Sequence, residues 1–210
     1  MKIVSVNIAR PIQVSWNGKT ETTGIYKVPA DGSIFLGTSR VTNDTIANHK
    51  VHGGPDKACY LFSSDHYPYW QERYPHLQWH WGMFGENLTI EGMDEARMRI
   101  GDIYRIGNAR VQVSQPREPC YKLGIKFGAQ KILKEFIAHA HPGTYVRVLR
   151  EGLVRAGDTA DLEEQSGNPL TVRQCFELIM APVKTREHLQ WALQNTALPA
   201  YKRDKLRKYQ

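Results

Sequence analysis

The chain has 210 residues, of which 41% are hydrophobic and 23% are charged, and these values argue against a disordered or fibrous protein. No apolar run approaches the length of a membrane span. The alternating N-terminal stretch MKIVSVNIAR lacks the apolar core and cleavage site of a secretion signal, so we expect a cytoplasmic protein. The formal net charge of +7 favours anionic partners such as phosphate-bearing cofactors or nucleic acid.

Short β-type segments broken by Gly, Pro and Asp run from residue 1 to about residue 165. Valines at every second position in RVQVSQ and TYVRVLR are typical of strands. The segments expected to form strands are 2–9, 24–30, 33–37, 87–92, 98–107, 109–116, 143–152 and 158–165. The stretches ADGS, EGMD, IGN and EGLV-RAGD predict turns. Many short strands with frequent turns indicate a barrel or a sandwich.

Helical patterns appear twice within this β-rich part and three times after it. The first two cover residues 63–74, with Pro68 in the first turn, and residues 128–140, with an apolar stripe at helical spacing. After the linker-like SGNP, three short helices are expected over 170–180, 185–194 and 199–209. Thr171 and Thr185 are plausible N-caps. We therefore expect a β-rich domain over 1–165 and a small three-helix domain over 166–210.

The three cysteines, Cys59, Cys120 and Cys175, are too few and too irregularly spaced for a disulfide framework or a zinc site. Cys59 lies in the apolar, strand-like run ACYLF, and Cys175 lies on a helix, so both are expected in the core. Cys120 differs because it follows a strand in the proline-stiffened sequence QPREPCYK. Neighbouring Arg117 and Lys122 favour the thiolate, which is the nucleophilic and metal-binding form. On these residues alone, a small core cysteine remains an equal alternative.

Two glycine-containing loops complete the candidate site. In HGGPDK, Gly53 and Gly54 allow positive φ angles and close backbone approach to an anion, while His52 and Lys57 are candidate contacts to phosphate or a pterin. An ordinary Gly-Gly-Pro turn with a surface histidine is the alternative.

In GMFGENLTIEG, Gly85 precedes Glu86 and Asn87. The Asn87 amide could face a heterocycle, or both polar residues could close a tight turn. The chain has no P-loop, dinucleotide fingerprint, HExxH or GxSxG motif. His139 and His141 are two residues apart on an expected helix, where they would face different directions, so a paired metal site there is not expected.

HGGPDKACY, GMFGENLTIEG, RIGDIYRIGNARVQVSQPREPCYKL and GTYVRVLREGLVRAGD, taken together and in this order, resemble the MOSC domain. That family is similar to the C-terminal domain of molybdenum-cofactor sulfurases. The helical C-terminal segment looks like the extension of the bacterial YiiM-type branch, so the resemblance covers nearly the whole chain. It implies a mostly β fold, with a β-barrel-like body, a few helices and a small C-terminal three-helix domain.

The resemblance also implies a function. The family's shared cysteine falls on Cys120, which would ligate molybdenum or carry sulfur to it. Stand-alone bacterial members are linked to the reduction of N-hydroxylated compounds such as 6-hydroxylaminopurine. Removing the N–O oxygen consumes two electrons, which no side chain stores reversibly, so a molybdenum cofactor (molybdopterin) is expected.

In this hypothesis Arg117, Lys122 and Lys57 neutralise the negative charge of the cofactor. Gly53, Gly54 and Gly85 bring backbone donors close to it, the GEN loop with Asn87 forms part of the pocket, and His52 or Glu86 relays protons. A separate flavoprotein or iron–sulfur protein would supply the electrons, because no such centre has a motif here.

Two alternative functions remain, and the roles of the basic C-terminal tail and of oligomerisation are open. Cys120 could instead carry a persulfide and pass sulfur to a metal centre elsewhere. The chain could also be a non-catalytic module that binds a cofactor, or nucleic acid through the basic tail YKRDKLRKYQ. The tail holds five Lys/Arg and one Asp, and we interpret it as a solvated final helix because no nucleic-acid-reading motif accompanies it. A homodimer is compatible with the sequence.

Overall fold

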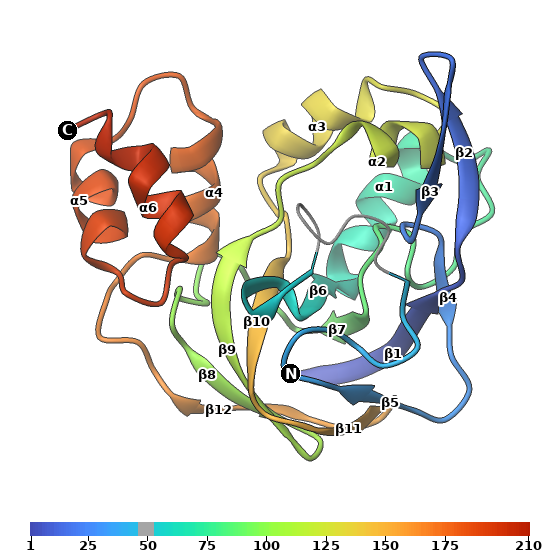
Figure 1. Cartoon of the computed structure of the whole chain (residues 1–210), viewed down its shortest axis with the longest axis horizontal. Coiled ribbons are helices and arrows are strands. Elements are labelled where there is room, and N and C mark those ends of the chain that lie inside the picture. Colours follow the sequence, from blue (N-terminus) through green and yellow to red (C-terminus); the bar gives the residue numbers. More distant parts are fainter. Residues whose placement is uncertain (46–52) are drawn as a thin grey trace.

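A computed structural model describes residues 1–45 and 53–210. Its main feature is an eight-stranded sheet in the order β12-β8-β9-β10-β6-β7-β1-β4, in which only β6 and β7 pair in parallel (Figure 1). These strands are β1 Lys2–Ala9, β4 Lys27–Pro29, β6 Cys59–Ser63, β7 Leu88–Glu91, β8 Ile103–Ile106, β9 Ala109–Pro116, β10 Thr144–Arg150 and β12 Ala160–Glu164. Two small antiparallel sheets pair β2 Ile12–Trp16 with β3 Lys19–Thr23, and β5 Ser33–Leu36 with β11 Gly152–Arg155.

The large sheet curls so that β1 meets the segment entering β12. The Ile3 amide donates to the carbonyl of Asp158 at 2.8 Å, and the Ala160 amide donates to the carbonyl of Met1 at 3.0 Å. Backbone pairing across this seam removes most of the open edge that a flat sheet would leave. The expected barrel-like body is therefore confirmed.

Six α-helices and two short 3₁₀ helices surround the described part of the barrel. They are η1 Pro55–Lys57, η2 Ser64–His66, α1 Tyr67–Arg73, α2 Tyr121–Lys126, α3 Ile132–His139, α4 Val172–Met180, α5 Arg186–Gln194 and α6 Ala200–Arg207. Helices α1 to α3 gather at one end of the barrel and α4 to α6 lie beside β9 (Figure 1). An aromatic core that includes Trp70, Phe84 and Phe136 packs the first group together.

The local sequence explains where several helices begin. Thr171 accepts from the Gln174 amide, and the Gln174 side chain accepts from the Thr171 amide, which forms a capping box at the start of α4. Thr185 occupies the N-cap position of α5, but its side chain makes no capping hydrogen bond. Pro68 lies in the first turn of α1, where a missing N–H costs nothing.

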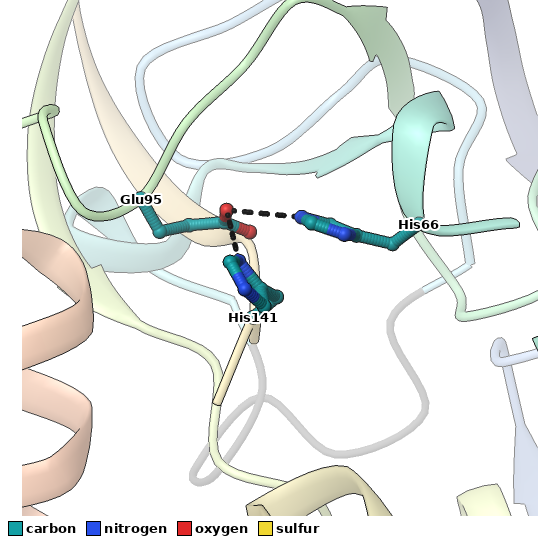
Figure 2. A group of neighbouring side chains, drawn as sticks. All are labelled: His66, Glu95 and His141. Carbon is teal, nitrogen blue, oxygen red and sulfur yellow. Dashed lines mark hydrogen bonds and ion pairs between the residues drawn. The ribbon is translucent and has the colours of Figure 1, made fainter. Parts of the chain in front are cut away.

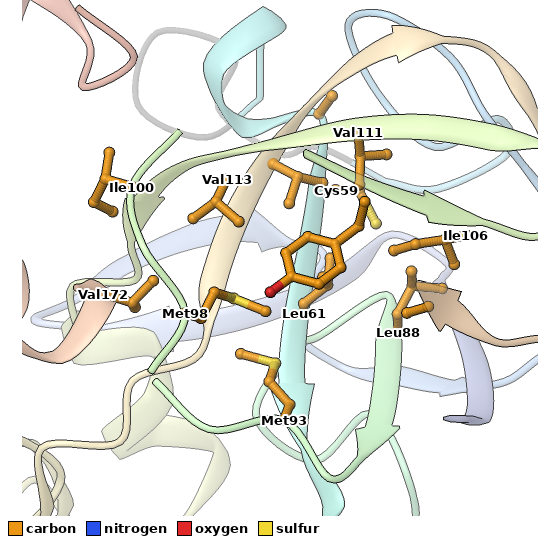
Figure 3. Packing of buried hydrophobic residues seen from close by; sticks show 14 of the residues in the cluster. Cys59, Leu61, Leu88, Met93, Met98, Ile100, Ile106, Val111, Val113 and Val172 are labelled. Carbon is orange, nitrogen blue, oxygen red and sulfur yellow. The ribbon is translucent and has the colours of Figure 1, made fainter. Parts of the chain in front are cut away.

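The C-terminal helices share a hydrophobic core with the barrel. Val172 and Cys175 of α4 are fully buried in the same cluster as Val111 and Val113 of β9. Figure 3 shows Val172 beside Ile100 in this cluster. The division into domains at residues 165 and 166 stays a prediction, and the structure adds that apolar contacts join the two segments.

Several segments differ from the sequence prediction, and the β2–β3 hairpin is one that was not expected. The predicted turn EGLV contains strand β11, because Val154 is buried and pairs with Ile34 of β5. Helix α2 begins directly after Cys120, where no helix was expected. Of the predicted strand 98–107, only Ile103–Ile106 forms a strand, and Arg99 forms an isolated bridge with Thr171. Among the described residues, no helix is long and apolar enough to cross a membrane.

Candidate functional site

A cavity of about 110 Å³ opens beside the end of β9, and Cys120 forms part of its wall. Its lining comes from loops that are far apart in sequence. The described lining residues are Thr23, Gly24, Ile25, Lys27, Asp44, Thr45, Gly53, Lys57, Ala58, Tyr60, Phe84, Gly85, Asn87, Arg117, Glu118, Cys120, Lys122 and Tyr145. The fold therefore brings Gly53, the GEN loop and the PREPC segment to one place.

A second hollow of about 500 Å³ adjoins this cavity. Gly53, Lys57, Glu118, Cys120 and Tyr145 line both spaces, and helix α6 closes the far side of the second one. A volume of this size falls within the range of small-molecule sites. Cys120 therefore lies in the lining of both hollows, of which the larger has the volume of a small-molecule site.

The backbone before and after Cys120 holds the thiol at this position. Pro116 ends β9, and the extended Cys120 starts α2, with its carbonyl accepting from the Leu123 amide at 2.9 Å. Cys120 is half-buried, whereas Cys59 and Cys175 are fully buried in the hydrophobic core. Burial raises the pKa of Cys59 and raises that of Cys175 to about 12. The prediction that these two are core residues is confirmed.

Arg117 is the most informative cation of the cavity. Its side chain is 5% exposed, and its guanidinium lies 5.2 Å from the ring of Phe136 and 5.7 Å from the ring of Tyr60. Within the described residues its Nη1 has no hydrogen-bond partner, although it is buried. A buried cationic donor without an acceptor is costly in an empty site and is satisfied by an anionic ligand.

Two lysines extend the positive charge. Lys122 lines the cavity beside Arg117, donates to the carbonyl of Thr22 at 3.2 Å and lies 3.5 Å from a Glu21 carboxylate oxygen. Burial, with the nearby Lys205 ammonium group, lowers the pKa of Lys57. The electrostatic site therefore includes helix α6 as well as the barrel loops.

The glycine loops adopt the predicted backbone. Gly53 and Gly54 have φ of 99° and 83°, and Gly85 has φ of 82°. A Cβ on Gly85 would come within 3.0 Å of the Ile25 side chain, so a side chain there would narrow the cavity wall. Gly53 lines both spaces and Gly54 lines the second. His52, the predicted proton relay, lies outside the described residues.

Glu86 is fully buried behind the loop and is absent from the lining. Its carboxylate accepts from the Tyr67 hydroxyl at 2.5 Å, the Gly82 amide at 2.9 Å, the Phe84 amide at 3.0 Å and the Thr89 hydroxyl at 2.9 Å. These contacts hold the GMFGEN turn in shape. The sequence left two roles open for Glu86, closing a tight turn or relaying protons. The geometry favours the turn-closing role, and the proton relay stays a prediction.

Asn87 does line the cavity, but protein groups occupy its amide. Its oxygen accepts from the Tyr60 amide at 3.2 Å, and its nitrogen donates to the carbonyl of Asn7 at 3.2 Å and to Asp44 at 2.9 Å. Asp44 also forms an ion pair with Lys27. Asn87 therefore fixes the wall of the cavity.

Helix α6 contributes residues that the sequence interpretation placed in solvent. Tyr201, Lys202 and Lys205 line the second hollow, and Lys202 is 6% exposed and ion-paired with Glu118. Burial, with the ammonium groups of Lys57 and Lys205, lowers the pKa of Lys202 to about 7. The interpretation of the tail as simply solvated is therefore wrong for Lys202, whereas Tyr201 and Lys205 are exposed. All three line the hollow, so one face of α6 contributes to the cationic site.

The fold and the candidate site together are those of a β-barrel protein with a cysteine, glycine loops and cations around a cavity at one end. The comparisons with known proteins agree with this class. The MOSC domain family matches residues 48–161, and the chain belongs to this family. MOSC domains are a family connected with the molybdenum cofactor, so the function of this chain is related to that cofactor.

Individual relatives place the chain in the YiiM-type branch. It is similar to a crystal structure of YiiM from Geobacillus stearothermophilus, with a TM-score of 0.82 and 31% identity over 99% of this chain and 98% of that one. It is 35% identical to the uncharacterized protein YflK of Bacillus subtilis (strain 168), over 93% of this chain and 88% of YflK. It is also 37% identical to a protein named reductase from Gibberella moniliformis, over 69% of this chain but only 26% of that larger protein.

Proposed function

We propose that this chain is a molybdenum-cofactor-dependent reductase of N-hydroxylated compounds, with Cys120 as the sulfur ligand of the metal. The observation that carries the proposal is a half-buried thiol beside an arginine whose buried Nη1 has no partner among the described residues. A thiolate is a soft ligand of the kind that such metals prefer. The name of the fungal reductase, to which part of this chain is similar, supports a redox role.

The residues present fit the cofactor chemically. Cys120 supplies the sulfur, Arg117 supplies an unused donor, and the Lys57 and Lys122 side chains add positive charge for a phosphate-bearing pterin. When bound, the cofactor supplies reversible two-electron chemistry that no side chain provides. Gly53, Gly54 and Gly85 keep backbone atoms at the wall, where bulkier residues would take up space.

The proposed reaction converts R–NHOH, two electrons and two protons into R–NH₂ and water, as the N–O bond breaks. Substrates such as 6-hydroxylaminopurine present a flat heterocycle to the cavity. The aromatic rings of Tyr60 and Tyr145 lie in the lining and offer surfaces for stacking. The electrons come from a separate redox protein, a flavoprotein or an iron–sulfur reductase. His52 or Glu86 is the proposed proton relay.

The test compares Cys120→Ala with Cys175→Ala, a matched control that removes a core thiol far from the lining. Both variants are produced in molybdenum-replete cells, and bound molybdenum and hydroxylaminopurine reduction by a reduced viologen dye are measured. We expect Cys120→Ala to lose both and the control to keep both per folded molecule. Retention of both by Cys120→Ala refutes the ligand role. A wild-type protein without molybdenum that carries one extra sulfur on Cys120 indicates the sulfur-carrier alternative.

A further inference from the structure

Away from the cavity, three potential metal ligands converge at the end of three adjacent strands. His66 follows β6, Glu95 follows β7 and His141 precedes β10. In the sheet order β10-β6-β7, β6 and β7 run parallel and so end at the same edge, where the antiparallel β10 begins. The sheet topology therefore places two imidazoles and one carboxylate together, although His66 and His141 are 75 positions apart in the sequence.

The side chains point toward one another, as Figure 2 shows. His66 Nε2 lies 3.3 Å and His141 Nδ1 lies 3.1 Å from the same oxygen of Glu95, Oε2. One potential ligand atom from each residue lies within 4.8 Å of the others. Ligands of one zinc ion, each about 2.0–2.2 Å from the metal, are themselves separated by roughly 3–4 Å. Only small side-chain movements separate the observed cluster from a coordinating one.

The surroundings keep the ligands in place. Glu95 is fully buried, and its other oxygen accepts from the Gly143 amide at 3.0 Å. Asp65 accepts from the Gly92 amide at 3.0 Å, which ties the residue before His66 to the loop that carries Glu95. Hydrogen bonds of this kind orient ligands before the metal arrives.

A third imidazole lies at the edge of the cluster. The ring of His139 is 5.1 Å from that of His66 and 4.9 Å from that of His141, and its buried Nε2 has no hydrogen-bond partner in the described part of the chain. The sequence prediction that His139 and His141 face different directions is wrong. Helix α3 ends at His139, and the left-handed Ala140 (φ 57°) turns His141 toward the same cluster.

We propose that His66, Glu95 and His141 bind one divalent transition-metal ion, with zinc as the best fit. Imidazole nitrogens with a single carboxylate suit zinc and its first-row neighbours, whereas magnesium and calcium require mainly oxygen ligands. The His66 and His141 side chains are 16% and 20% exposed, so the ion can enter from solvent and keep a water ligand. The ion would join the three loops into one rigid unit. This unit is connected to the cavity wall, because the hydroxyl of the lining residue Tyr60 donates to the carbonyl of Pro142 at 2.7 Å.

The experiment measures zinc bound per chain after equilibrium dialysis, in wild type, His66→Gln, His141→Gln and the exposed-histidine control His76→Gln. Cys120→Ala is included because a thiolate also binds zinc. We expect one zinc in wild type, His76→Gln and Cys120→Ala, and at least tenfold weaker binding in His66→Gln and His141→Gln. Zinc bound equally by all five proteins, bound by none, or lost only in Cys120→Ala overturns the proposal.

Two further readouts separate coordination from a structural hydrogen-bond network. Cobalt substituted into the Cys120→Ala protein should give the visible bands of a nitrogen–oxygen ligand set, and His141→Gln should abolish them. Zinc should raise the melting temperature of the wild type and leave that of folded His141→Gln unchanged, because only a native-state site links binding to stability. Absence of the bands, or an equal zinc effect on both proteins, contradicts the site.

Discussion

The Tyr201 hydroxyl of α6 donates to the Gln115 side-chain oxygen of β9 at 2.6 Å, across 86 positions of the chain. The Gln115 nitrogen in turn donates to the carbonyl of Asp56 at 3.2 Å. One buried amide thus joins the final helix, the strand that leads to Cys120 and the loop that carries Lys57. The cationic hollow depends on this link, because Lys202 and Lys205 enter it from the same helix as Tyr201.

Replacing Tyr201 by Phe should loosen α6 while leaving the barrel folded. The change removes one hydrogen bond and leaves the buried Gln115 oxygen unsatisfied, so we expect a loss of about 1–2 kcal/mol in the free energy of unfolding, measured in urea. Sulfate binding, measured calorimetrically, should weaken at the same time. Tyr209→Phe is the control, because that hydroxyl makes no hydrogen bond among the described residues, whereas the Tyr201 hydroxyl does. Equal losses in the two variants would disprove the link.

Arg117 should affect binding and stability in opposite directions. Arg117→Met keeps an unbranched apolar stem for packing against Phe136 and Tyr60, and it removes a buried charge that has an unsatisfied donor. We expect molybdenum retention to fall at least tenfold while the ligand-free protein keeps or gains about 1 kcal/mol. Arg117→Ala should likewise lose the cofactor more than it loses stability. Thermal unfolding and metal analysis check both, and a loss of stability without loss of retention would contradict the role.

The barrel was predictable because strand burial leaves a period of two in the sequence. Val111 and Val113 of β9, and Val146 and Val148 of β10, alternate as expected and are all buried on one side of the sheet. Helix α2 was not predictable in this way. It is six residues long, and its buried positions include Lys122 and Lys126. A helix that buries lysines has no apolar stripe to reveal it.

The cavity was predictable only where the chemistry is local. The prolines and cations around Cys120 mark a candidate functional thiol in the sequence, and the structure places Cys120, Arg117 and Lys122 in the lining of one cavity. Lys202 was missed because a basic helix normally points its lysines to solvent. Lys202 is only 6% exposed because of tertiary packing, and it forms an ion pair with Glu118.

Lys202 should make anion binding depend on pH near neutrality. Burial, followed by the charges of Lys57 and Lys205, lowers its pKa to about 7, so the ammonium form that attracts anions predominates below pH 7 and is lost as the pH rises through this value. Sulfate, whose own charge is constant in this range, should bind roughly fivefold more weakly at pH 8.5 than at pH 6, equivalent to about 1 kcal/mol. Lys202→Met should flatten this dependence, whereas the exposed Lys208→Met should preserve it. An unchanged slope in Lys202→Met would refute the assignment.

Glu86→Gln tests whether the buried carboxylate holds the loop or moves protons. Four donors reach Glu86, and a glutamine can accept with only one of its two terminal atoms, so at least one donor is left unsatisfied or faces an NH₂ group. A structural role predicts a loss of about 3 kcal/mol in unfolding free energy, which lowers the melting temperature of a chain of this size by about 6–12 °C. Activity per folded molecule and its pH profile should stay near wild type. Glu91→Gln, at the exposed end of strand β7 that follows the Glu86 loop, should change neither property. A stable Glu86→Gln protein with a collapsed turnover rate or a shifted pH profile would instead establish the proton relay, because a side chain that only shapes the loop does not alter how the rate depends on pH.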